Sequence, residues 1–298
     1  MVHIPVLVDE VLQYLDLSEG EKAIDCTAGQ GGHTVRMAEV VGEEGGVLAI
    51  ERDPIAATAL VQKVLKQGMH DRIVVANGNY RDIADISQEE GFEGAQGILF
   101  DLGFSSWQIE ESGRGFSFQK DEPLDMRYDP TDEESRSARD IVNGASREEL
   151  ENILREYGEE PRARLVAKAI ADARKKAPIE TTAQLSVIVA LVTRARPGMN
   201  PATRTFQALR IAVNDELLVV KQGLEGARSV AGEGCRIVVI SFHSLEDRIV
   251  KNEFRSWKEQ GFGTILTKKV VTARYGETRE NRRSRSAKLR AFLITNNQ

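Results

Sequence analysis

Short apolar runs alternate with stretches of helical periodicity along the first hundred residues of the chain. Turn residues follow each run, and apolar residues then recur every three or four positions, as in an amphipathic helix. Strands that alternate with helices favour a parallel sheet that is covered by helices on both faces. The predicted strands span 22–26, 47–51, 72–76 and 97–101, and the predicted helices span 33–41 and 55–67.

The pattern changes after the fourth predicted strand. Residues 102–135 are rich in glycine, serine and acidic side chains and have no strand pattern, whereas residues 136–195 are mostly helical in pattern. The helices expected there span 146–157 and 163–176, followed by one that Thr181 and Thr182 cap and that runs to about Arg194. We therefore predict a helical domain inserted into the sheet domain.

The alternation of strand and helix returns near residue 200. We expect a helix at 203–218, a buried strand at 235–241 and a helix at 245–257, and two late apolar runs, 264–272 and 288–295, predict a closing antiparallel pair. The predicted organisation is an α/β domain in two parts, 1–106 and 201–298, which flank an inserted helical domain, 107–200.

Length and composition suit one large domain with an insert, or two domains: the chain has 298 residues, of which 41% are hydrophobic. No apolar run approaches the ~20 residues of a membrane span, and the N-terminus has no secretory signal pattern. Cys26 and Cys235 lie in separate apolar runs, which favours buried thiols over a disulfide or metal site. We expect a cytoplasmic protein, and we identify no cluster of metal ligands.

Charge is distributed unevenly along the chain. The whole chain carries −6, but residues 268–290 hold nine basic and two acidic residues, a net +7, which leaves −13 for the remainder. A basic surface on an acidic body suits a polyanion such as nucleic acid. A solvated basic tail explains the same pattern, and the charge alone does not separate the two.

A glycine-rich loop follows the first predicted strand and has the features of a ligand site. It runs from Asp25 to His33 and contains Gly29, Gly31 and Gly32 before a helix begins. Glycine allows a ligand to approach the backbone closely, and the start of a helix offers free amides. Taken alone, the loop indicates a nucleoside-type ligand.

Carboxylates end three of the predicted strands, and their positions narrow the choice of ligand. Asp25 ends the first strand, Glu51 the second and Asp101 the fourth. A carboxylate in the position of Glu51 accepts hydrogen bonds from ribose hydroxyls, and acidic groups suit the ammonium and sulfonium of S-adenosylmethionine. A nicotinamide dehydrogenase is the alternative, but it requires the spacing G-x-G-x-x-G to bind a pyrophosphate.

Over nearly its whole length the chain resembles the bacterial 16S ribosomal RNA (cytosine(1402)-N4)-methyltransferases, which use S-adenosylmethionine. Long motifs carry the resemblance in order along the sequence. They include Gly31-Gly32-His33, Glu51-Arg52-Asp53-Pro54, Asp101-Leu102-Gly103-Phe104-Ser105-Ser106-Trp107-Gln108, Arg114-Gly115-Phe116-Ser117-Phe118, Leu124-Asp125-Met126-Arg127, and the segments 201–210, 240–248 and 283–290.

The resemblance implies a class I methyltransferase fold: a Rossmann-like, mostly parallel sheet with an antiparallel C-terminal strand and an inserted helical domain. It implies methylation of one cytosine amine in small-subunit ribosomal RNA, which would be the partner; the choice between monomer and homodimer stays open. The residues expected to bind S-adenosylmethionine are Asp25, Gly31, Gly32, His33, Glu51, Tyr80, Asp101 and Gln108. Glu51 stands where many members have aspartate, Tyr80 where phenylalanine is frequent, and Trp107 where proline is common.

The exocyclic N4 of cytosine is a poor nucleophile, because its lone pair is delocalised into the ring. An enzyme must place an acceptor on its N–H and align it with the methyl group. Other amino-methyltransferases have Asn/Asp-Pro-Pro-aromatic at this strand end, whereas this chain has Asp101-Leu102-Gly103-Phe104. We hypothesise that Asp101 or a nearby backbone carbonyl is the acceptor, and that Phe104, Trp107 or Phe116 stacks on the base.

Several candidate residues have two explanations each. His243 suits a general base or a residue that orders its loop, and His33 suits a ligand contact or a helix start in which only the backbone matters. Arg204 and Arg210 suit RNA phosphates or pairing with acids. The remaining substrate candidates are Arg114, Phe116 and the basic insert residues Arg162, Arg164, Lys168, Arg174, Lys175 and Lys176, although Phe116 and Phe118 also suit a core.

Three other functions remain compatible with parts of the sequence. A methyltransferase of this fold that acts on a small molecule would not require the +7 segment, and one that acts on a different RNA base would share most features. An inactive RNA-binding protein would not require the glycine loop together with Glu51 and Asp101.

Overall fold

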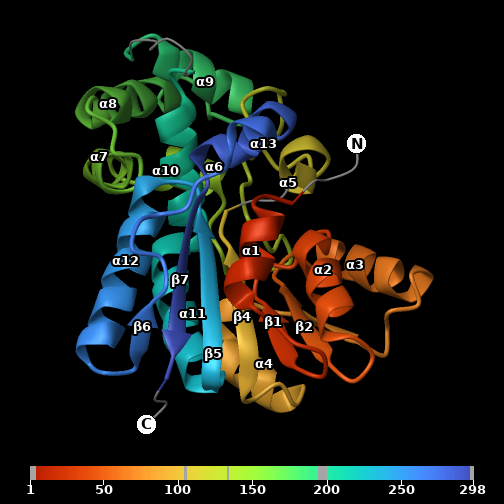
Figure 1. The fold of residues 1–298 in the computed structure, drawn as a ribbon. Coiled ribbons are helices and arrows are strands. Elements are labelled where there is room, and N and C mark those ends of the chain that lie inside the picture. The colour runs from red at the N-terminus through yellow and green to blue at the C-terminus, as the bar shows by residue number, and fades with distance from the viewer. Residues whose placement is uncertain (1–4, 104–105, 133, 194–199, 296–298) are drawn as a thin grey trace. The chain divides into compact units, whose positions relative to one another are not determined.

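The computed structural model describes residues 5–103, 106–132, 134–193 and 200–295. The chain divides into two compact units (Figure 1). Residues 1–103 and 217–298 form the sheet unit, and residues 104–216 form the helical unit. The helical unit contains the predicted insert, residues 107–200, together with the next helix of the chain.

The sheet unit is built on a seven-stranded sheet with the strand order β3-β2-β1-β4-β5-β7-β6. The first five strands in this order are parallel, and β7 is antiparallel to both β5 and β6. This order, with its antiparallel C-terminal strand, is that of class I methyltransferases, as predicted. The strands are β1 (Lys22–Asp25), β2 (Gly46–Glu51), β3 (Ile73–Asn77), β4 (Ala95–Asp101), β5 (Ala231–Ser241), β6 (Gly263–Ile265) and β7 (Lys288–Ile294).

Helices of the sheet unit cover both faces of the sheet. Along β4, Ile98 and Phe100 enter one apolar cluster, whereas Leu99 enters another. Side chains alternate between the two faces of a strand, so a sheet buried on both faces reads as a continuous apolar run. The helices are α1 (Val8–Leu15), α2 (Gly32–Val41), α3 (Pro54–Lys66), η1 (Tyr80–Asp82), α4 (Ile83–Glu89), α11 (Glu216–Val230), α12 (Ser244–Glu259), α13 (Tyr275–Glu280) and η2 (Arg282–Ser286).

The helical unit has an apolar core of its own, which includes Leu150, Val166 and Leu209. Thr181 caps α9 through a hydroxyl that accepts from the amide of Gln184, which confirms the predicted cap. The helices are α5 (Ser106–Glu110), α6 (Ala138–Gly144), α7 (Arg147–Glu156), α8 (Ala163–Arg174), α9 (Thr182–Ala190) and α10 (Thr203–Asn214).

The prediction of one helix over 203–218 is wrong. α10 ends at Asn214, Asp215 adopts the left-handed conformation with φ 51°, and α11 begins at Glu216. The apolar spacing continues across this break, so periodicity could not reveal it. The side chain of Asn214 binds the backbone of Met126 and Tyr128, and such contacts between distant residues are invisible to a local pattern.

The predicted closing pair of strands is confirmed, although its first member is short. β6 spans only Gly263–Ile265, and beyond it Val271 forms an isolated bridge with Leu289 on β7. Cys26 and Cys235 are free and buried, as predicted, and burial raises the pKa of Cys235 to about 12. Among the described residues, no helix combines the length and the apolar character needed to cross a membrane.

Candidate active site

The loop between β1 and α2 is organised around Asp25. This side chain is buried at the end of β1, and its two oxygens accept from the Thr34 hydroxyl at 2.7 Å and the Thr27 amide at 3.1 Å. Burial raises the pKa of Asp25, although the nearby His33 and these two hydrogen bonds oppose the rise. Because one oxygen binds the loop and the other binds the first turn of α2, Asp25 maintains the shape of the loop.

Two glycines of the loop are required by the backbone and by its neighbours. Gly31 has φ 74°, a conformation that other residues adopt at a cost, and a Cβ there would collide with the side chain of Leu60. Gly32 begins α2, and a Cβ there would lie 3.1 Å from Pro5. A side chain at either position would therefore disturb the loop.

Glu51 links the glycine loop to the end of β2. One carboxylate oxygen accepts from the Gly29 amide and the other from the Asp53 amide, each at 2.8 Å. Burial raises the pKa of Glu51 to about 7, despite these hydrogen bonds, which lower it. Each oxygen keeps a second lone pair, so the carboxylate can accept from two hydroxyls of a ribose.

His33 and Asp101 form a buried pair beside the loop. Nε2 of His33 lies 3.5 Å from Oδ2 of Asp101. Burial alone would lower the pKa of His33, but the contact with Asp101 and the charges of Asp101, Asp25 and Glu277 together raise it. The ring of His33 thus contacts a protein carboxylate, and its proposed contact with the methyl donor stays a prediction.

The second oxygen of Asp101 is buried and accepts from no donor among the described residues. Within the part of the chain that the structure describes, neither Oδ1 of Asp101 nor Nε2 of His33 has a hydrogen-bond partner. The backbone amide of Asp101 donates to the Thr27 hydroxyl at 2.7 Å and so holds the end of β4 against the loop. A buried acceptor of this kind is normally satisfied by a partner, which fits a ligand that carries N–H or O–H donors.

Tyr80 follows β3 and packs edge-on against Phe100, with ring centroids 5.5 Å apart. Gly223 of α11 makes room for the ring, because a Cβ there would contact the ring of Tyr80. Tyr80 is half-buried at the same edge of the sheet as Glu51. Its proposed contact with the methyl donor stays a prediction.

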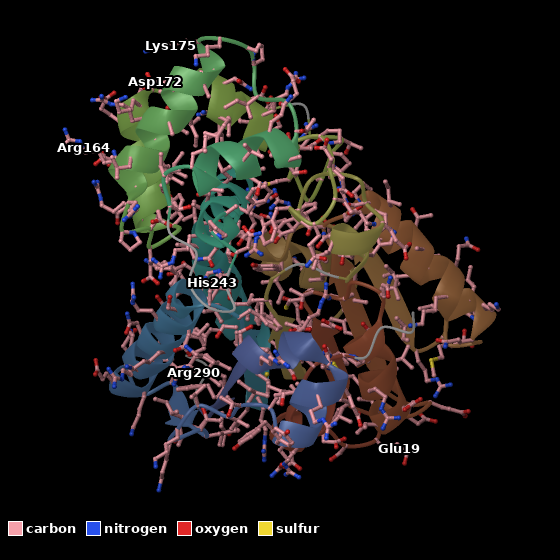
Figure 2. The ribbon with its side chains drawn as sticks, turned by 90° about the horizontal axis from the view of Figure 1, so that it is seen from above. Glu19, Arg164, Asp172, Lys175, His243 and Arg290 are labelled. Carbon is pink, nitrogen blue, oxygen red and sulfur yellow. The ribbon has the colours of Figure 1, made fainter. Side chains whose placement is uncertain are left out.

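His243 caps α12 (Figure 2). Its Nδ1 accepts from the Glu246 amide at 3.4 Å, and the Glu246 carboxylate accepts from the amides of Phe242 and His243. Because Nδ1 is an acceptor, the ring proton of a neutral imidazole lies on Nε2, which is 3.1 Å from the Glu246 carboxylate. This reciprocal cap favours the structural explanation for His243.

The other predicted site residues belong to the helical unit. Phe104 lies outside the described residues, so its stacking role stays a prediction. Gln108 is buried on α5, and its backbone carbonyl accepts from the Ser112 hydroxyl. Trp107 packs against the guanidinium of Arg114, 5.2 Å from the ring centroid.

Arg114 and Phe116 are buried in the helical unit. Arg114 donates to the carbonyls of Arg127 and Tyr128 at 3.1 and 3.0 Å. Phe116 stacks on Tyr128, with centroids 5.5 Å apart and an interplanar angle of 12°. Both side chains thus contribute to the internal packing of this unit, which is the second explanation given for Phe116.

Arg210 and Arg204 also bind groups of their own unit. Arg210 donates two hydrogen bonds to Glu216, at 2.8 and 3.0 Å, and both side chains are buried. The Tyr128 hydroxyl donates to the same carboxylate. Arg204 donates to the carbonyl of Glu159 at 2.6 Å. Of the two explanations given for these arginines, pairing with an acid therefore applies to Arg210.

The predicted basic face of α8 is partly neutralised. Lys168 and Lys175 both pair with Asp172, at 2.6 and 3.2 Å, and Arg174 donates to a carbonyl of α6. Arg164 is exposed, and Figure 2 shows it with Asp172 and Lys175 along the outer side of α8. Exposed pairs of this kind contribute little to stability, so the two lysines can bind another anion in place of Asp172.

Sequence reasoning missed three residues that organise this site. The hydroxyls of Thr27 and Thr34 hold Asp101 and Asp25, and the charge of Glu277 reaches His33 from the other end of the chain. Thr27 and Thr34 lie within or next to the loop, so polar residues near the glycines were an available signal. Nothing local to Glu277 indicates its neighbour.

The chain is similar to known proteins over nearly its whole length. Residues 1–295 match the model of a family described as the MraW methylase family. A protein of Thermomicrobium roseum is 44% identical and covers 97% of this chain and 92% of its own length, and one of Symbiobacterium thermophilum is 41% identical with 98% and 96% covered. A protein of Deinococcus radiodurans is 44% identical, with 97% and 88% covered. All three are named ribosomal RNA small subunit methyltransferase H.

Proposed function

Because the chain belongs to the MraW methylase family, we propose that it transfers a methyl group from S-adenosylmethionine to the N4 amine of cytosine 1402 in 16S ribosomal RNA. The observation that carries the proposal is the full-length similarity to ribosomal RNA small subunit methyltransferases. The three carboxylates of the glycine-loop site support it independently. The compartment proposed is the cytoplasm, where the two buried thiols stay reduced.

The residues of the glycine-loop site fit the methyl donor. Glu51 would accept from the ribose hydroxyls, and the Gly31–Gly32 backbone would admit the donor closely. Asp101 would lie near the positive charge of the donor, because its Oδ1 accepts from no donor among the described residues. When bound, S-adenosylmethionine supplies a methyl group on a sulfonium, which is electrophilic enough for a weak amine to attack.

Asp101 would also hold the acceptor amine. Its Oδ1 has no protein donor among the described residues, while Oδ2 lies against His33. A carboxylate that accepts from the N4 amine localises electron density on nitrogen and orients its lone pair. The amine loses its proton after the transfer, and solvent can receive it, so a dedicated base is not required.

The helical unit is proposed to recognise the RNA, with α8 and its exposed Arg164 as the element that contacts phosphates. Phosphate contacts position an enzyme on RNA, whereas contacts to the unpaired base give specificity. Lys168 and Lys175 would exchange the Asp172 carboxylate for phosphate oxygens during binding.

Mapping of N4-methylcytidine tests the proposed function. We expect that 16S ribosomal RNA from cells lacking the protein has no N4-methyl group at cytosine 1402 by mass spectrometry, and that the wild-type gene restores it. Purified protein should then methylate small subunits from those cells. Unchanged modification in the deletion strain would remove the assignment of this nucleotide, and a small-molecule methyltransferase of the same fold would become the better candidate.

The raised pKa of Glu51 predicts that the binding of S-adenosylmethionine depends on pH. Because the pKa of Glu51 is higher in the folded state, its contribution to the free energy of unfolding is lost as the pH rises from 4.5 to about 7. Ribose hydroxyls favour the ionised form, so binding releases a proton below pH 7. We expect affinity to increase with pH up to about 7 and then to level off, with Kd at pH 6 about tenfold higher than at pH 8.

The matched control is Glu51→Gln, which cannot titrate. Calorimetry with both proteins between pH 5.5 and 8.5 separates Glu51 from the amino group of the ligand, which also titrates. The variant should bind more weakly at pH 8 and should lose the part of the pH dependence that belongs to Glu51. Identical pH profiles for the two proteins would exclude this role.

A further inference from the structure

α13 exposes an aromatic ring among basic side chains. Tyr275, the first residue of this helix, is 79% exposed. A single exposed ring is ordinary on a folded surface, so the basic residues of the same segment are what distinguish this one. We define the α13 surface as this ring together with the exposed basic residues around it in the sequence: Lys268, Lys269, Arg274, Arg279 and Arg285.

Most basic residues of the α13 surface form no ion pair with the described residues of the sheet unit. Among the described residues, no acidic side chain lies within ion-pair distance of Lys268, Lys269, Arg279 or Arg285. Arg274 lies 3.7 Å from Glu10, but its side chain is 89% exposed. These five positive charges are therefore available to an anionic partner.

Other basic residues of the same segment have a different environment. Lys288 and Arg290 on β7 both pair with Asp247, at 3.7 and 2.7 Å, and are only partly exposed (Figure 2 labels Arg290). Lys288 and Arg290 thus bind an acid of their own unit, unlike the basic residues of the α13 surface.

α13 is anchored beside the glycine loop. The carboxylate of Glu277 accepts from the Leu7 amide at 2.8 Å, and its charge also reaches His33. Pro5, two residues before Leu7, packs against Gly32. The exposed ring is therefore carried by a fixed element of the sheet unit, next to the loop assigned to the methyl donor.

We propose that the α13 surface binds single-stranded RNA, with Tyr275 stacked on an unpaired base and the basic side chains on the flanking phosphates. Stacking on an exposed aromatic ring combined with positive charge is how proteins bind unpaired nucleotides. The inference rests on the proposed function and extends it, because it adds a contact surface on the sheet unit to the contacts proposed for the helical unit.

The stacking contact is tested by RNA affinity. The probe is a labelled single-stranded fragment of 16S ribosomal RNA that contains the target cytosine, and binding is followed by fluorescence anisotropy. Tyr275→Ala should raise Kd for the fragment about 5- to 100-fold, whereas Tyr275→Phe should retain the wild-type value, because the ring is kept. Melting temperature and Kd for S-adenosylmethionine should stay unchanged, since the ring is exposed.

The charge contribution is tested by the dependence of Kd on salt. Replacing Arg279 and Arg285 together with glutamine should lower the slope of log K against log salt by about 1.4, because each phosphate contact of a single strand contributes about 0.7. The control is Lys66→Gln on α3, an exposed lysine of the same unit outside the α13 surface, which should leave the slope unchanged.

Retained RNA affinity in Tyr275→Ala, or an unchanged salt slope in the double variant, would overturn the proposal; so would binding of an acidic peptide with the same affinity as RNA. Failure here differs from failure of the proposed function. If the variants methylate cytosine 1402 normally and bind RNA with unchanged affinity, only the role of the α13 surface is excluded. If the wild-type protein binds RNA through this surface but does not methylate it, the proposed function is excluded and the role of the α13 surface is retained.

Discussion

Replacing Asp101 with asparagine is expected to lower kcat for methyl transfer by about 10²- to 10⁴-fold, the usual contribution of a positioned acid–base group. The amide still accepts a hydrogen bond, but it has no charge to localise electron density on the N4 amine. Kd for S-adenosylmethionine should change far less than kcat. Single-turnover kinetics with saturating donor and small subunits measure the first quantity, and calorimetry measures the second.

Asp25→Asn is the matched control for this experiment. It is also a carboxylate at a strand end, but its two oxygens bind the glycine loop and the first turn of α2. Its replacement should weaken donor binding and lower the melting temperature more than it lowers kcat. If Asp101→Asn keeps full turnover with unchanged donor affinity, Asp101 is not the acceptor, and a backbone carbonyl near it becomes the candidate.

Arg210→Ala is expected to lower the free energy of unfolding of the helical unit by about 3–5 kcal/mol, because it leaves the charge of Glu216 buried without its guanidinium partner. The Tyr128 hydroxyl would then be a remaining donor to this carboxylate. A urea titration followed by circular dichroism, with hydrogen exchange of the helical unit, measures the loss.

The double variant Arg210→Met with Glu216→Leu provides the comparison. Removing both charges usually costs little, so its stability should be close to that of the wild type. Folded Arg210→Ala should bind RNA with unchanged Kd. If Arg210→Ala instead binds RNA more weakly while its stability is unchanged, Arg210 contacts an RNA phosphate.

The sheet could be predicted from sequence because its strands are buried on both faces. The runs that end at Glu51 and Asp101 are continuous in apolar residues and are followed by turn residues, so local pattern was enough. The helix α11 was missed, and the break at Asp215 was not expected. Both depend on how α10 and α11 pack, and apolar spacing carries no information about a single left-handed residue.

The candidate site was predicted in outline for a related reason. Parallel strands place their carboxyl ends at one edge of a sheet, so the strand pattern alone was enough to expect Asp25, Glu51 and Asp101 at one edge. The hydrogen-bond partners and the pKa of each carboxylate were not predictable. Asp25 binds its own loop, Glu51 has a pKa of about 7, and Asp101 keeps one oxygen without a protein donor among the described residues.

By itself, the sequence determined the order of the strands, the glycine loop and the position of the acids, because these depend on residues that are neighbours in the chain. Only the tertiary structure decided which charges have partners. Arg210 is paired with Glu216, whereas Arg279 forms no ion pair with an acid among the described residues, and Glu277 binds the amide of Leu7 at the opposite end of the chain. A charged side chain acts on whatever folding brings within a few ångströms of it, and local spacing does not encode that neighbour.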